Sequence, residues 1–431
     1  LHIAMKVAKN CRYVEPQFTL RFDKETSEEI WDEALDALGA GATYPTLYND
    51  DVNVPAVMYG MRVDEKTAEQ YVPFGCTEFV IQGQSTGTPN ICINLLKLLT
   101  IYMNDGIDPI DGKRKSGPVS LKKLEEYQTF EEFYDGYKAL LDYYLDLSVK
   151  AQYHSYEVMN QHVSFLFTSL LTDDCIARGK ALLDGGVRYL GGTNETYGNI
   201  NTSDSLWVIR DLVFNQKKYT LRQLNDAMLA NFNGYEALRK DCLNCDKYGN
   251  DLETADTMAN DLYEFVAKGV RDRGIAIGMQ YFLIVISNNQ LNTEWGNRTA
   301  ASPDGRLSCM YMNPANNPQG GANKSGPTAM LNSLAKFDAK YHGGSVQNIK
   351  FSPSMFNENR AVIKSLFKTY FAKGGCHLMV TVVDKGVLED AVEHPENYPD
   401  LIVRVSGFSA VFVDLSPNIQ QELLSRVLYD E

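Results

Sequence analysis

The chain has 431 residues, of which 44% are apolar and 22% are charged, ordinary proportions for a globular protein. Its net charge of −14, with no offsetting run of Lys or Arg, argues against nucleic acid or an anionic membrane as a partner. It has no apolar stretch of membrane-spanning length, no visible secretion signal and too few cysteines for a disulfide scaffold. We therefore expect a cytoplasmic protein with reduced thiols.

The first elements are predicted from capping and from apolar spacing. A helix is expected over 27–38, where Thr26 and Glu29 have the spacing of a capping box. The next segment, 42–55, is rich in turn formers and is expected to be irregular. Because the chain starts at Leu1 and not at Met, we also expect a segment to precede it.

A cysteine and a glutamate precede a strongly apolar helix. That helix is predicted over 91–103, with Thr88 and Pro89 as its N-cap and first residue, and it should be buried because it is apolar on nearly every side. Cys76 and Glu78 would then lie on a short loop that points into the protein, which is an unusual place for a carboxylate.

The middle of the chain is predicted to be mainly helical, with a glycine-rich connection over 185–199 and a polar, turn-rich stretch after Asn297. Cys242 and Cys245 form one C-x-x-C pair, which we interpret as two incidental thiols because no second pair or His lies nearby. The expected helical segments are 121–183, 204–213, 220–240 and 254–268.

The last quarter alternates helix and strand. A helix over 362–371 is followed by a buried strand over 377–384, a helix over 386–394 and a second strand over 401–405. This order predicts a parallel βαβ unit. A final amphipathic helix is expected to begin at Ser416.

Gly407 joins two apolar, strand-like runs in the segment RVSGFSAVF (404–412). It is therefore predicted to occupy the tip of a buried finger. The simplest explanation is a turn glycine chosen because it tolerates positive φ.

The segment around Gly407 resembles a known family signature. YPDLIVRVSGFSAVFVDLS (398–416) is similar to the signature of the glycyl radical enzymes, the pyruvate formate-lyase superfamily. Further similar blocks occur in family order over essentially the whole chain: LYNDDVNVP, GCTE, GGVRY, DSLWVIRDLVF, ASPDGR, NKSGPTAMLNS and QNIKFSP.

The resemblance implies a fold. We expect an α/β ten-stranded barrel made of two antiparallel half-barrels, of which this chain carries the second half, the C-terminal half of the enzyme. Residues 1–310 would belong to the barrel and 311–431 to a glycine radical domain. The loops of Cys76 and Gly407 should meet inside the barrel, with the thiol sulfur a few ångströms from the glycine α-carbon.

The resemblance also implies catalytic roles. Gly407 would store a backbone radical and Cys76 would pass it to the substrate. The sequence Cys76-Thr77-Glu78 resembles the Cys-x-Glu of the eliminating and decarboxylating branches, in which the carboxylate is a base. Burial should raise the pKa of Glu78. A carboxylate that only pairs with an Arg or with backbone amides is the structural alternative.

The favoured reaction is dehydration, or another elimination, of a small hydroxylated substrate. Decarboxylation of an arylacetate-type acid and acyl transfer like that of pyruvate formate-lyase stay open. Three departures argue against glycerol, propanediol or choline as substrate: Phe79 replaces a proline, Asn90 replaces an acid of the vicinal diol dehydratases, and Met379-Val380-Thr381 replaces Gln-Phe-Asn.

The expected cofactor is the radical on Gly407 itself, with no bound metal or nucleotide. The resemblance implies that a separate iron–sulfur, S-adenosylmethionine-dependent activating enzyme installs it. A small molecule is the expected substrate, and we expect a homodimer. A spare-part protein, which only replaces a damaged C-terminal segment, is a poorer match because this chain is long and retains Cys76.

One rival hypothesis fits locally. Gly83-Gln84-Ser85-Thr86-Gly87 is a literal G-x-S-x-G between a predicted strand and a helix, as in the nucleophile elbow of a serine hydrolase. Ser85 would be the nucleophile, but no His lies in a recognisable triad motif. The available histidines are His162, His342, His377 and His394.

Overall fold

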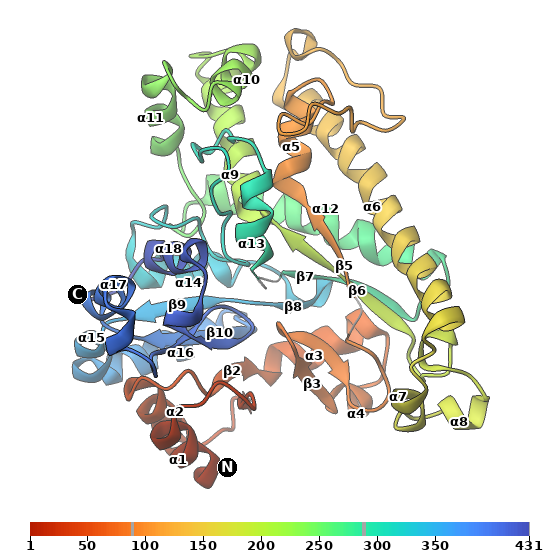
Figure 1. The fold of residues 1–431 in the computed structure, drawn as a ribbon, viewed down its shortest axis with the longest axis vertical. Helices are drawn as coiled ribbons and strands as arrows, with labels where there is room; N and C mark the ends of the chain where they lie inside the picture. Colours follow the sequence, from red (N-terminus) through yellow and green to blue (C-terminus); the bar gives the residue numbers. More distant parts are fainter. Residues whose placement is uncertain (88–89, 287–289, 431) are drawn as a thin grey trace.

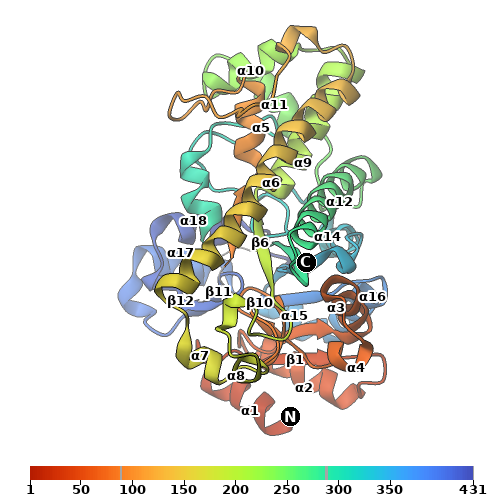
Figure 2. The same cartoon turned by 90° about the vertical axis from the view of Figure 1, so that its right-hand side faces the viewer.

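The computed structural model describes residues 1–87, 90–286 and 290–430. It is a mixed α/β fold in which strands cross the middle of the molecule and long helices cover them (Figures 1 and 2). None of the helices in these residues is long and apolar enough to cross a membrane.

Four parallel strands form the central sheet, in the order β5-β6-β7-β8. Every residue of β6 and β7 is buried. The helices α6 (Phe130–His162) and α12 (Glu253–Ala276) pack against these strands, and α6 runs along the edge of the molecule in Figure 1. The strands are β5 (Ile91–Asn94), β6 (Gly191–Tyr197), β7 (Tyr281–Ile286) and β8 (His342–Ser345).

A second sheet has the order β1-β2-β10-β9. Its two pairs β1–β2 and β9–β10 are each parallel, and β2 and β10 run antiparallel. The two sheets contain eight strands, and closure into a ten-stranded barrel stays a prediction. The strands are β1 (Thr19–Phe22), β2 (Thr46–Asn49), β9 (Asn348–Phe351) and β10 (His377–Val382).

Two antiparallel hairpins complete the strands of the described residues. The first joins β3 (Tyr71–Phe74) to β4 (Glu78–Ile81), and the second joins β11 (Ile402–Arg404) to β12 (Ser409–Val411). The first turn contains Cys76 and the second contains Gly407, so the predicted finger around Gly407 is confirmed.

Most predicted helices are present. The helical elements in the described residues are α1 (His2–Cys11), α2 (Glu28–Gly39), α3 (Asp50–Met61), α4 (Glu65–Ala68), α5 (Leu95–Met103), η1 (Leu124–Glu126), α6 (Phe130–His162), α7 (Leu166–Leu170), α8 (Cys175–Arg178), η2 (Leu182–Asp184), α9 (Asn199–Val208), the π-helix η3 (Ile209–Asn215), α10 (Leu221–Leu229), α11 (Glu236–Asn244), α12 (Glu253–Ala276), α13 (Leu291–Glu294), η4 (Gly296–Arg298), α14 (Gly326–Leu334), η5 (Ala339–Tyr341), α15 (Pro353–Glu358), α16 (Arg360–Ala372), α17 (Lys385–Glu393), η6 (Pro395–Asn397), η7 (Phe412–Asp414) and α18 (Pro417–Ser425).

Two helix starts differ from the prediction. The N-cap of α2 is Ser27 and not Thr26, because the Ser27 hydroxyl accepts the Ile30 N–H. The apolar helix is buried as predicted, but it begins only at Leu95 with Asn94 as its cap, since the preceding residues pair with β6 as strand β5. The predicted cap at 88–89 lies outside the described residues.

The segment 42–55 is ordered and not irregular. It contains strand β2 and the start of α3, whose first turn has the acidic pair Asp50 and Asp51 that favours a helix N-terminus. Two of the polar residues that suggested turns, Asn49 and Asn53, are buried and hydrogen bonded to the backbone. Asn49 donates to two backbone carbonyls and Asn53 donates to the carbonyl of Cys376.

About half of the glycine-rich connection over 185–199 is a strand. Residues 191–197 form β6, in the middle of the parallel sheet. Its glycines allow close packing and do not make turns: a methyl group at Gly191 would lie 2.2 Å from the ring of Tyr281, and one at Gly192 would lie 2.8 Å from the ring of Phe282.

The predicted parallel βαβ unit is wrong. The strand, helix and strand exist as β10, α17 and β11, but β11 pairs with β12 and not with β10. Both edges of β10 are already occupied, one by β2 and the other by β9, so no edge is left for β11.

Candidate active site

Cys76 sits in a tight turn between two antiparallel strands. Its neighbours Gly75 and Thr77 both have positive φ, at 53° and 91°, and the Thr77 amide closes the turn on the carbonyl of Phe74. A positive φ is unusual for a β-branched residue and marks a turn held in place by its surroundings. The Thr77 carbonyl lies against β8, where a methyl group on Gly344 would come within 2.3 Å of it.

Gly407 lies directly against Cys76. A methyl group on Gly407 would be 2.4 Å from the α-carbon and 2.7 Å from the sulfur of Cys76. Because a Cα–Cβ bond is about 1.5 Å long, the sulfur lies within about 4 Å of the Gly407 α-carbon. The expected separation of a few ångströms is therefore observed.

Gly407 is required here by space and not by backbone conformation. Its φ is outside the positive range, unlike that of Gly75, so the turn-glycine explanation does not apply. Its carbonyl accepts a 2.9 Å hydrogen bond from the side-chain amide of Gln17, which fixes the tip of the finger from a third segment.

Glu78 is the first residue of β4 and is almost fully buried, with 4% of its surface exposed. Its Oε1 accepts a 3.1 Å hydrogen bond from Asn90, and its Oε2 has no hydrogen-bond partner in the described part of the chain. Burial raises the pKa of Glu78 to about 8, with a further upward contribution from the charge of Glu195; hydrogen bonds from backbone amides and Asn90 only partly oppose this. The predicted direction of the shift is confirmed.

The sequence reasoning missed a polar face on β6. Thr193, Glu195 and Tyr197 are all buried and point to one side of the strand, because alternate residues of a strand share a face. They hydrogen bond with Asn90 and with one another. The alternation was visible in TNETY, but the flanking glycines suggested a loop.

Apolar side chains pack against Cys76, which is itself partly exposed. Its thiol packs with Ala315, Val346 and Met379. His342 and His377 are buried, and burial lowers the pKa of His342 to about 4 and holds that of His377 well below its usual value.

Arg404 is the buried cation nearest this site. It is 1% exposed, donates to the sulfur of Met379 and the hydroxyl of Ser409, and lies over the ring of Tyr44. Burial lowers the pKa of Arg404, while the nearby groups Tyr44, Tyr48 and Cys76 act in the opposite direction.

The structure does not favour the serine hydrolase hypothesis. The Ser85 hydroxyl accepts the backbone N–H of Ile81 at 2.9 Å, and in the described residues no histidine hydrogen bonds to it. The two buried histidines use their Nδ1 atoms as acceptors for the backbone amides of Gly344 and Gln347. Ser85 therefore has no base within reach.

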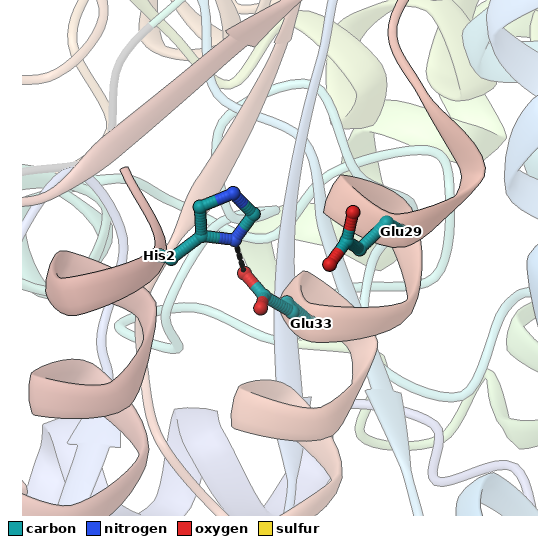
Figure 3. Close-up of side chains that lie close together, drawn as sticks. All are labelled: His2, Glu29 and Glu33. Carbon is teal, nitrogen blue, oxygen red and sulfur yellow. Dashed lines mark hydrogen bonds and ion pairs between the residues drawn. The ribbon is translucent and has the colours of Figure 1, made fainter.

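Among the described residues, one group of side chains has the spacing of metal ligands. His2, Glu29 and Glu33 lie together where α1 meets α2 (Figure 3). The pair His2–Glu33 at 2.7 Å is a surface ion pair, with the His side chain 53% exposed. The group belongs to the surface and is not part of the Cys76 site.

Two family models match the chain. A pyruvate formate lyase-like model matches residues 1–291, and a glycine radical model matches residues 312–413. The chain belongs to the pyruvate formate lyase-like glycyl radical enzymes. The predicted family is thereby confirmed, together with an α/β fold of its type.

Curated relatives of this glycyl radical enzyme include dehydratases. Trans-4-hydroxy-L-proline dehydratase of Clostridioides difficile is 30% identical, in an alignment covering 99% of this chain and 54% of the relative. (2S)-3-sulfopropanediol dehydratase of Klebsiella oxytoca is 28% identical, in an alignment covering 98% of this chain and 52% of the relative. The chain therefore spans about half the length of the curated relatives it matches.

The solved structures that resemble this chain also include dehydratases, and the chain again covers about half of their length. The B12-independent glycerol dehydratase of Clostridium butyricum superposes with a TM-score of 0.94 at 29% identity, over 100% of this chain and 55% of that one. Hydroxyproline dehydratase of Clostridioides difficile superposes with a TM-score of 0.93 at 28% identity, over 100% of this chain and 54% of that one.

Proposed function

We propose that this chain carries the radical half of a glycyl radical lyase that removes water from a small hydroxylated substrate. The observation that carries the proposal is the contact between Cys76 and Gly407, with the unpartnered Oε2 of Glu78 on the same hairpin. The dehydratases among its relatives support this reaction over decarboxylation or acyl transfer.

The proposed reaction begins at Gly407. Its α-carbon radical takes the hydrogen of the Cys76 thiol, and the resulting thiyl radical takes a hydrogen from a substrate carbon that carries a hydroxyl. Glu78 accepts the hydroxyl proton, which helps the adjacent C–O bond to break. Glu78 returns that proton to the departing hydroxide, which leaves as water. The product radical recovers a hydrogen from Cys76, and the thiyl radical then takes a hydrogen back from Gly407, which restores the stored radical.

The environment suits these roles. Glu78 holds its proton more tightly than an ordinary carboxyl, so it can both accept and return a proton near neutral pH. The side chains of Ala315, Val346 and Met379, which pack with Cys76, carry no N–H or O–H group.

Other parts of the proposal concern the whole protein. A separate iron–sulfur, S-adenosylmethionine-dependent enzyme would install the radical, and the full-length protein would be a homodimer in the cytoplasm. The glycine radical model, which covers residues 312–413, supports the modification and a boundary near residue 310.

The test is anaerobic turnover by activated full-length protein, with polyols, trans-4-hydroxy-L-proline and arylacetates as separate probes. Loss of water from a hydroxylated probe supports the proposal, and Glu78→Gln should then lower kcat by about 10²–10⁴-fold. Release of carbon dioxide from an arylacetate, without loss of water from any other probe, would instead identify a decarboxylase.

A further inference from the structure

The candidate base is joined to a second buried carboxylate through one side-chain amide. The Nδ2 of Asn90 donates to Oε1 of Glu78 at 3.1 Å and to Oε1 of Glu195 at 2.9 Å. An amide nitrogen has two hydrogens, so this bridge uses both. The two carboxylates are 4% and 5% exposed, and they are therefore coupled in a site that excludes most water.

The bridge is held firmly from β6. The Thr193 hydroxyl donates to Oδ1 of Asn90 at 2.5 Å, which fixes the amide with its N–H groups toward the two carboxylates. The Tyr197 hydroxyl donates to Oε2 of Glu195 at 2.5 Å. On the neighbouring strand, Cys92 pairs in register with Glu195, and its thiol hydrogen bonds to that carboxylate.

The bridge makes the two oxygens of Glu78 unequal. Oε1 is tied to Asn90, while Oε2 has no hydrogen-bond partner in the described residues. Oε2 also lies beside the cysteine turn, since a methyl group on Gly75 would be 3.2 Å from it. A proton taken from a substrate held at Cys76 would therefore go to Oε2.

We propose that Glu195 is a positioning residue for Glu78: through Asn90 it anchors one carboxylate oxygen, leaves the other for the substrate, and by its charge sets how firmly Glu78 holds a proton. The role in turnover depends on the proposed function, in which Glu78 acts on the substrate. The bridge and its electrostatic effect do not depend on it.

The effect on protonation has a definite sign. Glu195 on β6 acts on Glu78 by its charge, whereas Cys76 acts on it through a backbone hydrogen bond. Tyr48 on β2 interacts with Glu78, and Arg404 on β11 interacts with Tyr48 and Cys76. The thiol of Cys92 on β5 interacts with Glu195. Of these, Glu195 adds to burial in raising the pKa of Glu78. A neutral residue at 195 should lower that pKa, and an extra carboxylate at 90 should raise it further.

Two substitutions separate this role from a merely structural one. Glu195→Gln keeps an oxygen that can accept from Asn90 but removes the charge. Asn90→Asp removes the donor and adds a charge. A structural defect would move both variants in the same direction, whereas the proposed role moves them in opposite directions. Glu358→Gln, at an exposed position, is the matched control for loss of a negative charge.

The experiment is a pH titration of unactivated full-length protein by infrared spectroscopy, following the carbonyl stretch of the protonated carboxyl. The band of Glu78 is assigned by its loss in Glu78→Gln. We expect its midpoint, near pH 8 in the natural protein, to fall by roughly one pH unit in Glu195→Gln. It should rise in Asn90→Asp and stay unchanged in Glu358→Gln.

An unchanged midpoint in folded Glu195→Gln, or a shift in the same direction in Asn90→Asp, would overturn the proposal. If Glu195→Gln does not fold, Glu195→Ala replaces it, because it removes the same charge; a lower midpoint for Glu78 is again the expected result. The measurement needs neither radical nor substrate, so its failure is distinct from failure of the proposed function. That function fails if the activated Glu78→Gln enzyme keeps its turnover.

Discussion

Gly407 has no side chain at the point where the cysteine hairpin comes closest to it. The contact leaves room for a hydrogen atom only, because even a methyl carbon would overlap the α-carbon of Cys76. Because Gly407 has no side chain, a radical on its α-carbon can be planar and the thiol of Cys76 can approach it. At this residue, packing and chemistry therefore impose the same choice.

Replacing this glycine should affect packing and the radical together. Gly407→Ala should abolish the radical in the electron paramagnetic resonance spectrum of anaerobically activated full-length protein. The overpacked methyl should also lower the free energy of unfolding by about 1–3 kcal/mol. Gly83→Ala is the control: a methyl there meets nothing within 4 Å, so only its positive φ costs stability and the radical should persist. A normal radical signal from Gly407→Ala would contradict the assignment.

The burial of Glu78 should also be visible in stability. Because the folded state raises the pKa of Glu78 to about 8, folding favours its protonated form. That contribution is full below the ordinary glutamate pKa, near 4.5, and is lost as pH rises toward 8. We therefore expect Glu78→Gln to gain stability relative to the natural protein between pH 5 and 8, on the order of a few kcal/mol.

Urea unfolding of unactivated full-length protein across this pH range is the measurement. Glu358→Gln, which removes an exposed carboxylate, should follow the natural protein at every pH. Parallel curves for Glu78→Gln and the natural protein would show that Glu78 is not held in its protonated form.

At the scale of elements, the sequence predicted helices better than strands. Helices such as α2 and α16 can be predicted because their apolar residues recur at helical spacing over three or more turns. β5 and β6 have only four and seven residues, and they lie next to polar or glycine-rich segments. β5 is a strand because it pairs with β6 within the sheet, and in β6 the flanking glycines obscure the alternation of TNETY.

The polar face of β6 was missed for the same reason. Read as a loop, the segment offers no reason for Glu195 to be buried. Read as a central strand, it places that carboxylate on the same side as Thr193 and Tyr197. Glu78, by contrast, was predicted as a site residue because a family motif marks it.

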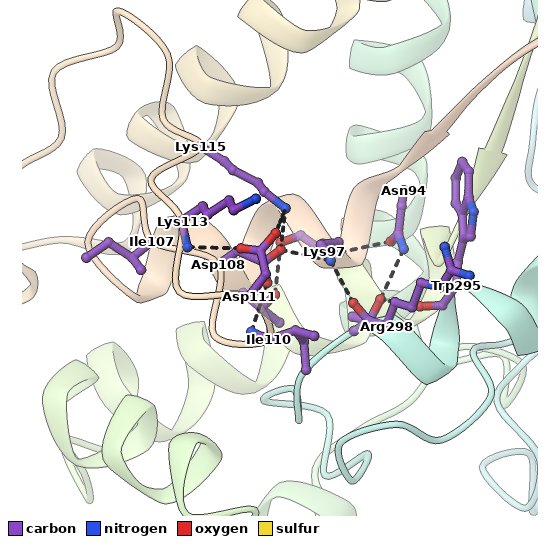
Figure 4. Close-up of polar contacts among 12 residues, drawn as sticks. Asn94, Lys97, Ile107, Asp108, Ile110, Asp111, Lys113, Lys115, Trp295 and Arg298 are labelled. Atoms are coloured by element: carbon purple, nitrogen blue, oxygen red, sulfur yellow. Dashed lines mark hydrogen bonds and ion pairs between the residues drawn. The ribbon is translucent and has the colours of Figure 1, made fainter.

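A buried ion-pair cluster fixes the start of α5, just after the strand that follows Asn90. Asp108 is 0% exposed, and its Oδ2 accepts from Lys115 at 2.6 Å and pairs with Lys97 at 2.9 Å (Figure 4). Lys97 also donates to the carbonyl of Arg298. The cluster thereby ties α5 to two loops.

Removing this carboxylate should be costly. Asp108→Asn leaves two ammonium groups without their shared partner, and we expect a loss of about 2 kcal/mol in the free energy of unfolding. Asp111→Asn is the control, because its carboxylate is 37% exposed and its pair with Lys115 should contribute at most about 1 kcal/mol. Equal losses in the two variants would mean that the burial of Asp108 has no energetic consequence.

The same cluster predicts a pH effect. Burial alone would raise the pKa of Asp108, but hydrogen bonds from Lys115 and Lys97 outweigh it and hold that pKa below its usual value. Its stabilisation is therefore present above about pH 4 and is lost as pH falls through the lowered pKa. Denaturant unfolding at decreasing pH should show a smaller acid-induced loss for Asp108→Asn than for the natural protein, and an equal loss in both would contradict this.

For the whole molecule, the important feature is that two distant hairpins meet. Cys76 and Gly407 come from opposite ends of the chain, and Gln17 from a third segment reaches the same turn. Periodicity and capping do not predict such a meeting. It was anticipated only because the segments around both residues resemble one family, and the mistaken βαβ unit shows where local pattern alone fails.

The last prediction uses oxygen to separate the roles of the two residues. A backbone carbon radical adds oxygen, and the resulting peroxyl breaks the chain at that residue. Air should therefore cut activated full-length protein next to Gly407, and mass spectrometry should find the C-terminal peptide. Unactivated protein and Gly407→Ala should stay intact. Cys76→Ser should still be cut, because the radical is stored without the thiol, yet it should not turn over any substrate. Cleavage of Gly407→Ala at the same place would assign the radical to another residue, and turnover by Cys76→Ser would remove the thiol from the reaction.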